Sequence, residues 1–186
     1  MKSNSKPYVK GLIQVQGNLS YLKTMSYVNT PQIEAYWQAF LESLPEESLQ
    51  RAEALLRTPI AEAWGDNAEL ADRLGNLIVA GVKTATCSSL WDWEIRQEPL
   101  PEIGLKTIVL NSQNQPMCIV ETTEVTIRVF EAVDGNFAFD EGEGERSLES
   151  WRAGHWRFFT RTLKPLHLQP TLEMPLVCEH FKVIYR

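Results

Sequence analysis

One short stretch of the chain holds the side chains best suited to chemistry. Lys83 is followed by the hydroxyl groups of Thr84, Thr86, Ser88 and Ser89. A lysine beside a partly desolvated wall loses some of its preference for the charged form and can act as a base. A threonine hydroxyl is a weak nucleophile until a neighbouring group takes its proton. Lys83 and Thr86 therefore indicate a nucleophile and its base if the chain bends between them, because extended backbone would point them to opposite faces. The alternative is a solvated lysine paired with a surface acid.

An acidic, glycine-spaced segment supplies carboxylates that such a pair could use. Its candidates are Glu141, Glu143 and Glu145. Glycines between them would let the backbone approach a ligand closely. The same carboxylates also suit solvent and the start of a following helix, so a purely structural role stays open.

Two further carboxylates stand on apolar faces of predicted strands. Glu121 shares a face with Ile119, and Glu179 shares one with Val177 and Phe181. A carboxylate in such surroundings must find hydrogen-bond donors or shift its pKa upward. Either could line a pocket with the lysine, or lie at the rim of a barrel.

Aromatic and basic side chains offer possible contacts to a nucleobase or phosphate. In extended backbone, Trp91 and Trp93 share one side and Glu94 takes the other. Exposed, each indole could stack a base for about 1–3 kcal/mol; buried, they are core residues. Arg146 could bind phosphate or balance the acidic segment. His155 falls on an aromatic helix face and is expected to be a packed histidine.

The beginning of the chain shows two kinds of pattern. Residues 1–29 have no sustained period and indicate a flexible basic arm, within which Met25 is an alternative start. From Thr30, predicted to cap a helix that has Pro31 at its first position, apolar residues recur at helical spacing. The single folded domain is therefore expected to span residues 30–186.

A helix is also predicted directly before the lysine. Asp66 and Glu69 stand in capping-box register, and Gly81 falls where a helix would end in a left-handed residue. The apolar face between them consists of Leu70, Leu74, Leu77 and Ile78.

The second half of the chain changes to the period of strands. Strands are predicted over residues 84–93, 106–110, 117–130 and 176–185, with a loop over 134–145. Ser147 is expected to cap a helix between the last two strands. Strands with helices set apart from them indicate an α+β domain.

Composition narrows the class of protein. A net charge of −6 argues against a protein that coats nucleic acid non-specifically. The three cysteines (Cys87, Cys118 and Cys178) are odd in number and lack metal-binding spacing, so reduced thiols in a cytoplasmic protein are expected. No apolar run is long enough to cross a bilayer. We expect no metal and no other cofactor.

Several short motifs follow one another along residues 33–185. They are Gly81-Val82-Lys83-Thr84-Ala85-Thr86, Trp91-Asp92-Trp93-Glu94, Glu98-Pro99-Leu100-Pro101, Glu121-Thr122-Thr123-Glu124-Val125, Gly142-Glu143-Gly144-Glu145-Arg146-Ser147-Leu148 with Trp151, and Pro175-Leu176-Val177-Cys178-Glu179. The first has the form G-x-K-x-x-T, and the ordered set resembles the ASCH domains, small relatives of the PUA RNA-binding fold. The resemblance implies a PUA-like β-barrel flanked by helices, here with a helical N-terminal extension.

The same resemblance implies an activity and its residues. Some ASCH-like proteins are amidohydrolases that deacetylate N4-acetylcytidine with a lysine, a threonine and a glutamate. By position these would be Lys83 as base, Thr86 as nucleophile and Glu143 as the glutamate. Glu141 and Glu145, which flank Glu143 in the same segment, are the alternatives for the glutamate. From the chemistry of the side chains, the residues expected to bind the substrate are Thr84, Ser88, Trp91, Trp93, Glu94, Glu121 and Arg146.

Other relatives bind RNA without turnover or act as metal-independent ribonucleases that use the same lysine. The resemblance therefore implies a small nucleoside or RNA as the partner, and whether the chain is an enzyme stays open. The acidic net charge favours an uncharged nucleoside, unless a basic groove is confined to one face. The smallest amidohydrolase relatives lack the long helical N-terminal half, which could cover the cleft and change the size of the substrate.

Overall fold

A computed structural model describes residues 30–56 and 59–186. The predicted arm, residues 1–29, and the alternative start at Met25 lie outside the described residues. The helices and strands follow in the order α1 (Pro31–Ser43), α2 (Leu49–Leu55), β1 (Ile60–Glu62), α3 (Ala68–Val79), β2 (Ala85–Ser89), α4 (Leu90–Arg96), β3 (Lys106–Leu110), β4 (Pro116–Val129), η2 (Phe130–Ala132), α5 (Gly135–Asp140), α6 (Leu148–Thr162), η3 (Lys164–Leu166) and β5 (Pro175–Tyr185).

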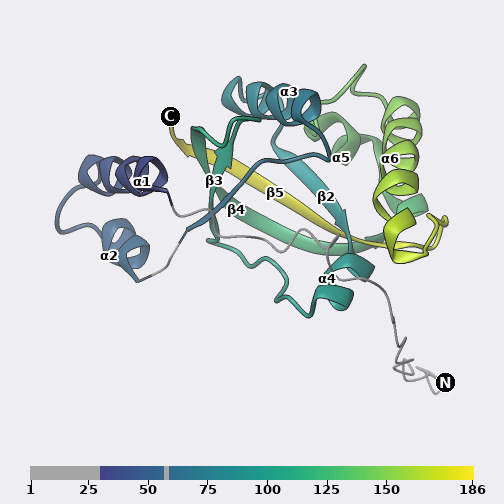
Figure 1. The fold of residues 1–186 in the computed structure, drawn as a ribbon, viewed down its shortest axis with the longest axis horizontal. Coiled ribbons are helices and arrows are strands. Elements are labelled where there is room, and N and C mark those ends of the chain that lie inside the picture. Colours follow the sequence, from purple (N-terminus) through teal and green to yellow (C-terminus); the bar gives the residue numbers. More distant parts are fainter. Residues whose placement is uncertain (1–29, 57–58) are drawn as a thin grey trace.

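The strands form one mixed sheet in the order β1-β3-β4-β5-β2 (Figure 1). β1 pairs with β3 in parallel, and the other neighbours are antiparallel. Register shifts in β3 and β4 mark irregularities of the kind that bend and twist a sheet. The sheet curls into a half-barrel with helices around it, which confirms the predicted α+β, PUA-like architecture.

Helices α1 and α3 pack on opposite faces of the same strand pair. Ile33 and Phe40 of α1 belong to a buried cluster with Ile108 of β3. Ile78 of α3 is buried with Val109, the next residue of that strand. Because successive strand residues point to opposite faces, the two helices cover the sheet from both sides.

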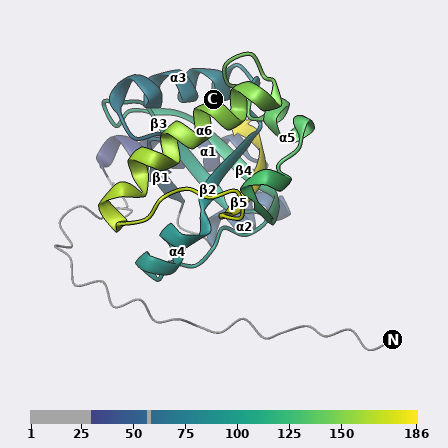
Figure 2. The ribbon, with the colours of Figure 1, turned by 90° about the vertical axis from the view of Figure 1, so that its right-hand side faces the viewer.

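A third apolar cluster joins α5 and α6 to the other end of the sheet. Trp151 and Phe159 of α6 are buried with Phe137 of α5 and with Leu176 and Cys178 of β5. Figure 2 shows α6 as a long helix beside α3 and α5. The space next to β2 is therefore bounded by helices that the sheet itself positions.

Two of the predicted helix caps are confirmed and one is wrong. The hydroxyl of Thr30 accepts from the backbone N–H of Ile33 at 3.2 Å, and Ser147 caps α6 in the same way. At α3, however, Asn67 is the cap, and its side chain accepts from the N–H of Leu70 at 2.9 Å. Asp66 is free to face another element.

The predicted strand over residues 84–93 ends early. β2 stops at Ser89, and the next seven residues form α4 instead. An ion pair between Asp92 and Arg96 at 2.6 Å, four residues apart, supports this helical turn, and Gln97 ends it in the left-handed region (φ 57°). A short apolar run is compatible with either structure, which is why the pattern misled.

Two more elements were not predicted. β1 is only three residues long, too short to show alternation. α5 lies inside the predicted loop over residues 134–145, and Asp134 caps it by accepting from the N–H of Phe137 at 2.9 Å. The acidic segment therefore begins at the end of a helix.

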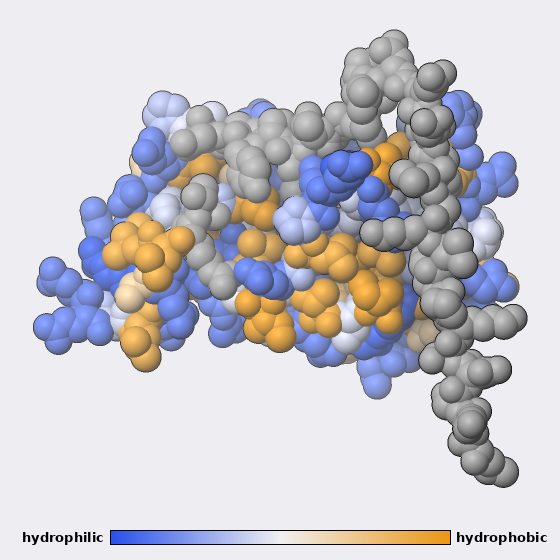
Figure 3. Space-filling view, turned by 90° about the horizontal axis from the view of Figure 1, so that it is seen from below, coloured by the Kyte–Doolittle hydropathy of each residue, from blue (hydrophilic) through white to orange (hydrophobic). Residues whose placement is uncertain are grey.

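The surface carries some exposed apolar side chains. Leu49, Leu55 and Leu56, in and directly after α2, are largely exposed. Figure 3, which views the molecule from below, shows apolar residues gathered between hydrophilic ones on that face. Within residues 30–56 and 59–186, no helix combines the length and the apolar character that a bilayer crossing requires.

Candidate active site

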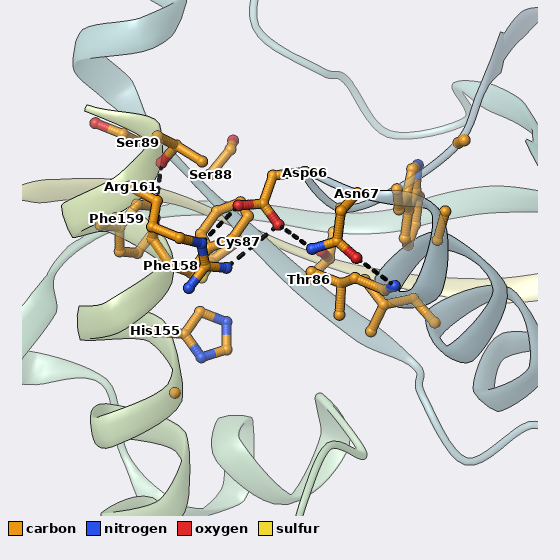
Figure 4. Close-up of a pocket in the computed structure, with 18 of the residues that line it drawn as sticks. Asp66, Asn67, Thr86, Cys87, Ser88, Ser89, His155, Phe158, Phe159 and Arg161 are labelled. Carbon is orange, nitrogen blue, oxygen red and sulfur yellow. Dashed lines mark hydrogen bonds and ion pairs between the residues drawn. The ribbon is translucent and has the colours of Figure 1, made fainter. Parts of the chain in front are cut away.

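A cavity of about 1050 Å³ lies beside the edge strand β2. Its walls come from β1, α3, β2, α4, α6 and the segment that follows α5. Arg161 of α6 and Asp66, ahead of α3, meet at this cavity with N···O distances of 2.8 and 3.2 Å (Figure 4). Predicted site residues that line it are Lys83, Thr86, Ser88, Trp93, Glu141 and Glu143.

Lys83 lies between two carboxylates. Its side chain is 1% exposed, and its Nζ pairs with Glu141 Oε2 and lies 3.1 Å from Glu143 Oε1. Glu141 is equally buried, whereas Glu143 is 23% exposed and also pairs with Arg73 at 3.5 Å. Two of the three candidate glutamates, Glu141 and Glu143, therefore contact the lysine.

The backbone explains why these residues meet although they are far apart in sequence. After α3, the N–H groups of Val82 and Lys83 both donate to Leu77 O, which turns the chain away from the helix. The N–H of Thr84 then donates to Asp140 O at 2.8 Å. At Gly142 (φ +70°), a Cβ would lie only 2.9 Å from Cα of Lys83, so only glycine permits this close approach.

The carboxylates around Lys83 shift its pKa. Burial alone lowers the pKa of its ammonium group, but the carboxylates of Glu141 and Glu143 more than offset this, and the pKa is raised. Burial alone would raise the pKa of Glu141, yet Lys83 and His155 bring it down to about 2. The raised pKa favours the ammonium form of Lys83, and its role as a base stays a prediction.

His155 and Cys87 complete the surroundings of Glu141. The His155 ring stacks on Trp151 (centroids 4.2 Å apart), as expected of a packed histidine, but its Nε2 also lies 3.3 Å from Glu141 Oε1. Cys87 also points here, and burial raises the pKa of its thiol well above the usual value. Cys87 could have been placed near Lys83 from the sequence, because in extended backbone Lys83, Ala85 and Cys87 lie on the same face.

Cys87, Glu141 and His155 form the one group of donors that could hold a metal ion among the described residues. Their ligand atoms all lie within 4.8 Å of one another, and the donor types suit zinc. The ammonium of Lys83, however, already occupies one oxygen of Glu141. A metal would have to displace it and ionise a thiol whose pKa is raised.

The structure brings some predicted binding residues to the cavity and not others. Ser88 and Trp93 line it, and the indole N–H of Trp93 donates to Ser88 Oγ at 2.8 Å. Trp91 instead packs against the cluster around α5 and α6, because on a helix it points away from Trp93. Glu94 is exposed and does not line the cavity.

The remaining candidates have structural partners outside the cavity. The hydroxyl of Thr84 donates to Asp140 O at 3.3 Å. Glu121 pairs with Lys106 and Lys182 at 3.1 and 2.9 Å. Arg146 covers the ring of Phe139 at 3.5 Å from its centroid, and Glu145 is exposed.

The N-terminal helices do not form part of the site. No residue of α1 or α2 lines the cavity; both helices pack at the far end of the sheet (Figure 1). Of the helical N-terminal half that was expected to cover the cleft, α1 and α2 therefore do not reach it. The helix of the N-terminal half that does reach it is α3, through Arg73 and Leu74 among others.

A curved mixed sheet with flanking helices and a cavity beside one edge strand is the architecture expected of a PUA-like domain. The family model of the ASCH domain matches residues 61–185, so the chain belongs to the ASCH domain family. Its fold is similar to the crystal structure of an ASCH domain from Lactobacillus crispatus JV V101, with a TM-score of 0.78 and 30% identity over 86% of this chain and 99% of that one. A crystallised protein from Enterococcus faecalis V583 is 37% identical, with a TM-score of 0.71 over 83% and 88% of the two chains. No curated protein matches the chain.

Proposed function

We propose that this ASCH domain hydrolyses the amide of an uncharged modified nucleoside, of which N4-acetylcytidine is the model. The observation that carries the proposal is the ammonium of Lys83, held between Glu141 and Glu143 at a cavity that Thr86 also lines. A fixed, desolvated cation is suited to stabilise the oxyanion that forms when an amide carbonyl is attacked.

Each residue then has a distinct role. Thr86 attacks the carbonyl carbon, and Lys83 donates a hydrogen bond to the carbonyl oxygen as negative charge develops there. Glu141, fully buried, holds the amine in place, and Glu143, which is partly exposed, is the carboxylate that can exchange contacts with a substrate. Lys83 and Thr86 both line the cavity, and in this proposal the substrate carbonyl lies between them.

The charges that line the cavity favour a neutral substrate. Seven carboxyl side chains and five lysine or arginine side chains line it. A site for polyphosphate or a long nucleic-acid backbone would need an excess of cations instead. Trp93 offers an aromatic surface at the same wall for a nucleobase.

The test is deacetylation of N4-acetylcytidine, followed by chromatography of the cytidine formed. Lys83→Met and Thr86→Ala should each lose activity by at least about a hundredfold. Matched controls are Lys182→Met and Thr123→Ala, because both residues lie outside the cavity and should leave the rate unchanged. An active Thr86→Ala variant, or an inactive wild-type protein, would contradict the proposal.

A second candidate function, recognition of RNA, is favoured by the size of the cavity. Its volume of about 1050 Å³ lies at the upper end of the range for small-molecule pockets. The space could therefore accept a modified base together with neighbouring nucleotides. Binding of short RNA with and without N4-acetylcytidine distinguishes the cases: tight binding without deacetylation supports a binding module, and Lys83-dependent cleavage of the RNA supports a ribonuclease.

A further inference from the structure

The residue opposite Thr86 on the neighbouring strand carries a carboxylate. Thr86 on β2 is the register partner of Glu179 on β5, and both residues line the cavity. Directly opposite residues of an antiparallel pair point to the same face, with Cβ atoms about 4.5–5.5 Å apart. A glutamate side chain in that position can reach the threonine hydroxyl.

The surroundings of Glu179 suit proton transfer near neutral pH. The pKa of Glu179 is raised to about 7, chiefly by burial and also by the negative charge of Glu62. The Thr122 hydroxyl, which donates a hydrogen bond to Glu179 Oε2 at 3.2 Å, lowers the pKa and opposes this rise. A carboxylate can accept hydrogen bonds at both oxygens, so the Thr122 contact leaves acceptor capacity for another donor. A base whose pKa lies near the working pH is the most effective.

Several of the other charged groups that line the cavity have ion-pair partners of their own, and Arg157 of α6 lines it as well. Arg73 of α3 pairs with Glu143, and Arg96 of α4 pairs with Asp92. From α6, Arg161 pairs with Asp66 and His155 with Glu141, which also binds Lys83. On the strand that carries Glu179, His180 faces Asp140 and Glu124. Glu62 of β1 is the charge that acts on Glu179.

We propose that Glu179 is the general base that activates Thr86, in place of the protonated Lys83. The inference rests on the proposed role of Thr86 as nucleophile, and it supplies the base that the ion-paired amine cannot provide. It makes Glu179 a catalytic residue, because it takes the proton from a reacting atom.

The steps balance with water as the only co-reactant. Glu179 takes the proton of the Thr86 hydroxyl as its oxygen bonds to the acyl carbon, and the carbonyl π electrons move to the oxygen beside Lys83. Collapse breaks the C–N bond, and the protonated Glu179 gives its proton to the leaving nitrogen. Water then attacks the carbonyl carbon of the acyl–Thr86 ester while Glu179 takes a proton from it. When the bond between that carbon and the Thr86 oxygen breaks, Glu179 returns the proton to the Thr86 oxygen, which restores the hydroxyl and releases the carboxylic acid.

The test uses p-nitrophenyl acetate, an activated ester that probes the nucleophile without any nucleoside. Acetylation of Thr86 is followed by intact mass and peptide mapping, with Thr86→Ala to report acetylation elsewhere. In wild-type protein the rate should rise through about pH 7 as Glu179 ionises. Glu179→Gln, which keeps size and hydrogen-bonding capacity, should lower the rate by about a hundredfold or more and remove the pH step.

Glu62→Gln provides an independent check. Without that negative charge, the pH step should move to lower pH while acetylation persists. Acetylation of Thr86 in Glu179→Gln at the wild-type rate, or no acetylation of Thr86 in the wild type at any pH, would overturn the inference. If Thr86 is acetylated through Glu179 but N4-acetylcytidine stays intact, the inference holds and only the proposed substrate is wrong.

Discussion

Lys83 and Glu141, 58 residues apart in the chain, form an ion pair in which each side chain is only 1% exposed. Removing two charges from water costs several kcal/mol per ion, so such a pair adds little net stability by itself. Removing one member of the pair does destabilise the fold, because the other member remains as a buried charge without its partner. The pair therefore couples the chemistry of the site to the stability of the fold.

Removal of one charge from this pair should destabilise the protein strongly. We expect Glu141→Gln to lower the free energy of unfolding by about 3 kcal/mol, since Lys83 would keep only Glu143. Chemical denaturation measures the change. Glu145→Gln, in the same segment but exposed, should stay within about 0.5 kcal/mol of wild type; equal effects of the two substitutions would contradict the assignment.

The same pair predicts sensitivity to acid. The pKa of Glu141 is lowered from 4.5 to about 2, so its contribution is fully present above about pH 4.5 and is lost as the pH falls toward 2. The shift corresponds to about 3 kcal/mol. Denaturation curves at several pH values should show this loss in wild type and a smaller one in Glu141→Gln.

The close approach of two loops at Gly142 predicts a steric effect. Gly142 and Gly81 have the same positive φ of +70°, but a Cβ on Gly142 would press against the backbone of Val82, while one on Gly81 would meet nothing within 4 Å. Gly81→Ala should therefore cost about 1–2 kcal/mol, from φ alone. Gly142→Ala should cost more than about 3 kcal/mol, and thermal unfolding of the two variants compares them directly.

Glu179 should destabilise the fold at high pH. Its pKa is raised to about 7 in the folded protein, so stability falls as the pH rises from about 4.5 to 7 and the buried group must ionise. Glu179→Gln should be more stable than wild type by about 2–3 kcal/mol at pH 8 and similar to it at pH 4. Urea titrations at the two pH values make the comparison; a pH-independent difference would mean that Glu179 does not titrate in this range.

The N-terminal helix should matter for stability and not for substrate. Phe40 of α1 is 2% exposed and packs in the cluster at the far end of the sheet from the cavity. Phe40→Ala should lower the free energy of unfolding by about 3–5 kcal/mol. In the assay of the proposed deacetylation, the KM of the folded variant should equal that of the wild type, and a changed KM would place α1 closer to the site than the structure does.

Parts of the fold with strong local signals could be predicted from the sequence. The hydroxyl caps at Thr30 and Ser147 and the alternation in β5 led to correct elements, because each depends on neighbouring residues alone. The Leu90–Arg96 segment failed for the opposite reason: its apolar residues fit a strand as well as a helix, and tertiary contacts decide between them.

In the site too, some contacts could be predicted from sequence motifs, whereas others depend on the tertiary structure. The set of Lys83 with a glutamate from the acidic segment was recognised through the family motifs, and the structure adds that two glutamates contact the lysine at once. The pairing of Thr86 with Glu179 depends on the register between β2 and β5, which no local pattern specifies. Likewise, the contact of His155 with Glu141 arises from the packing of α6.

The order of the strands has a consequence for biosynthesis. β2, which carries Thr86, has a single neighbour in the sheet, and that neighbour is β5, residues 175–185. On the ribosome, a nascent chain that has already exposed the lysine and the acidic segment still lacks the strand against which β2 must align. The part of the cavity wall that β2 and β5 form together is therefore complete only once β5, the last of the described strands in the chain, has paired with β2.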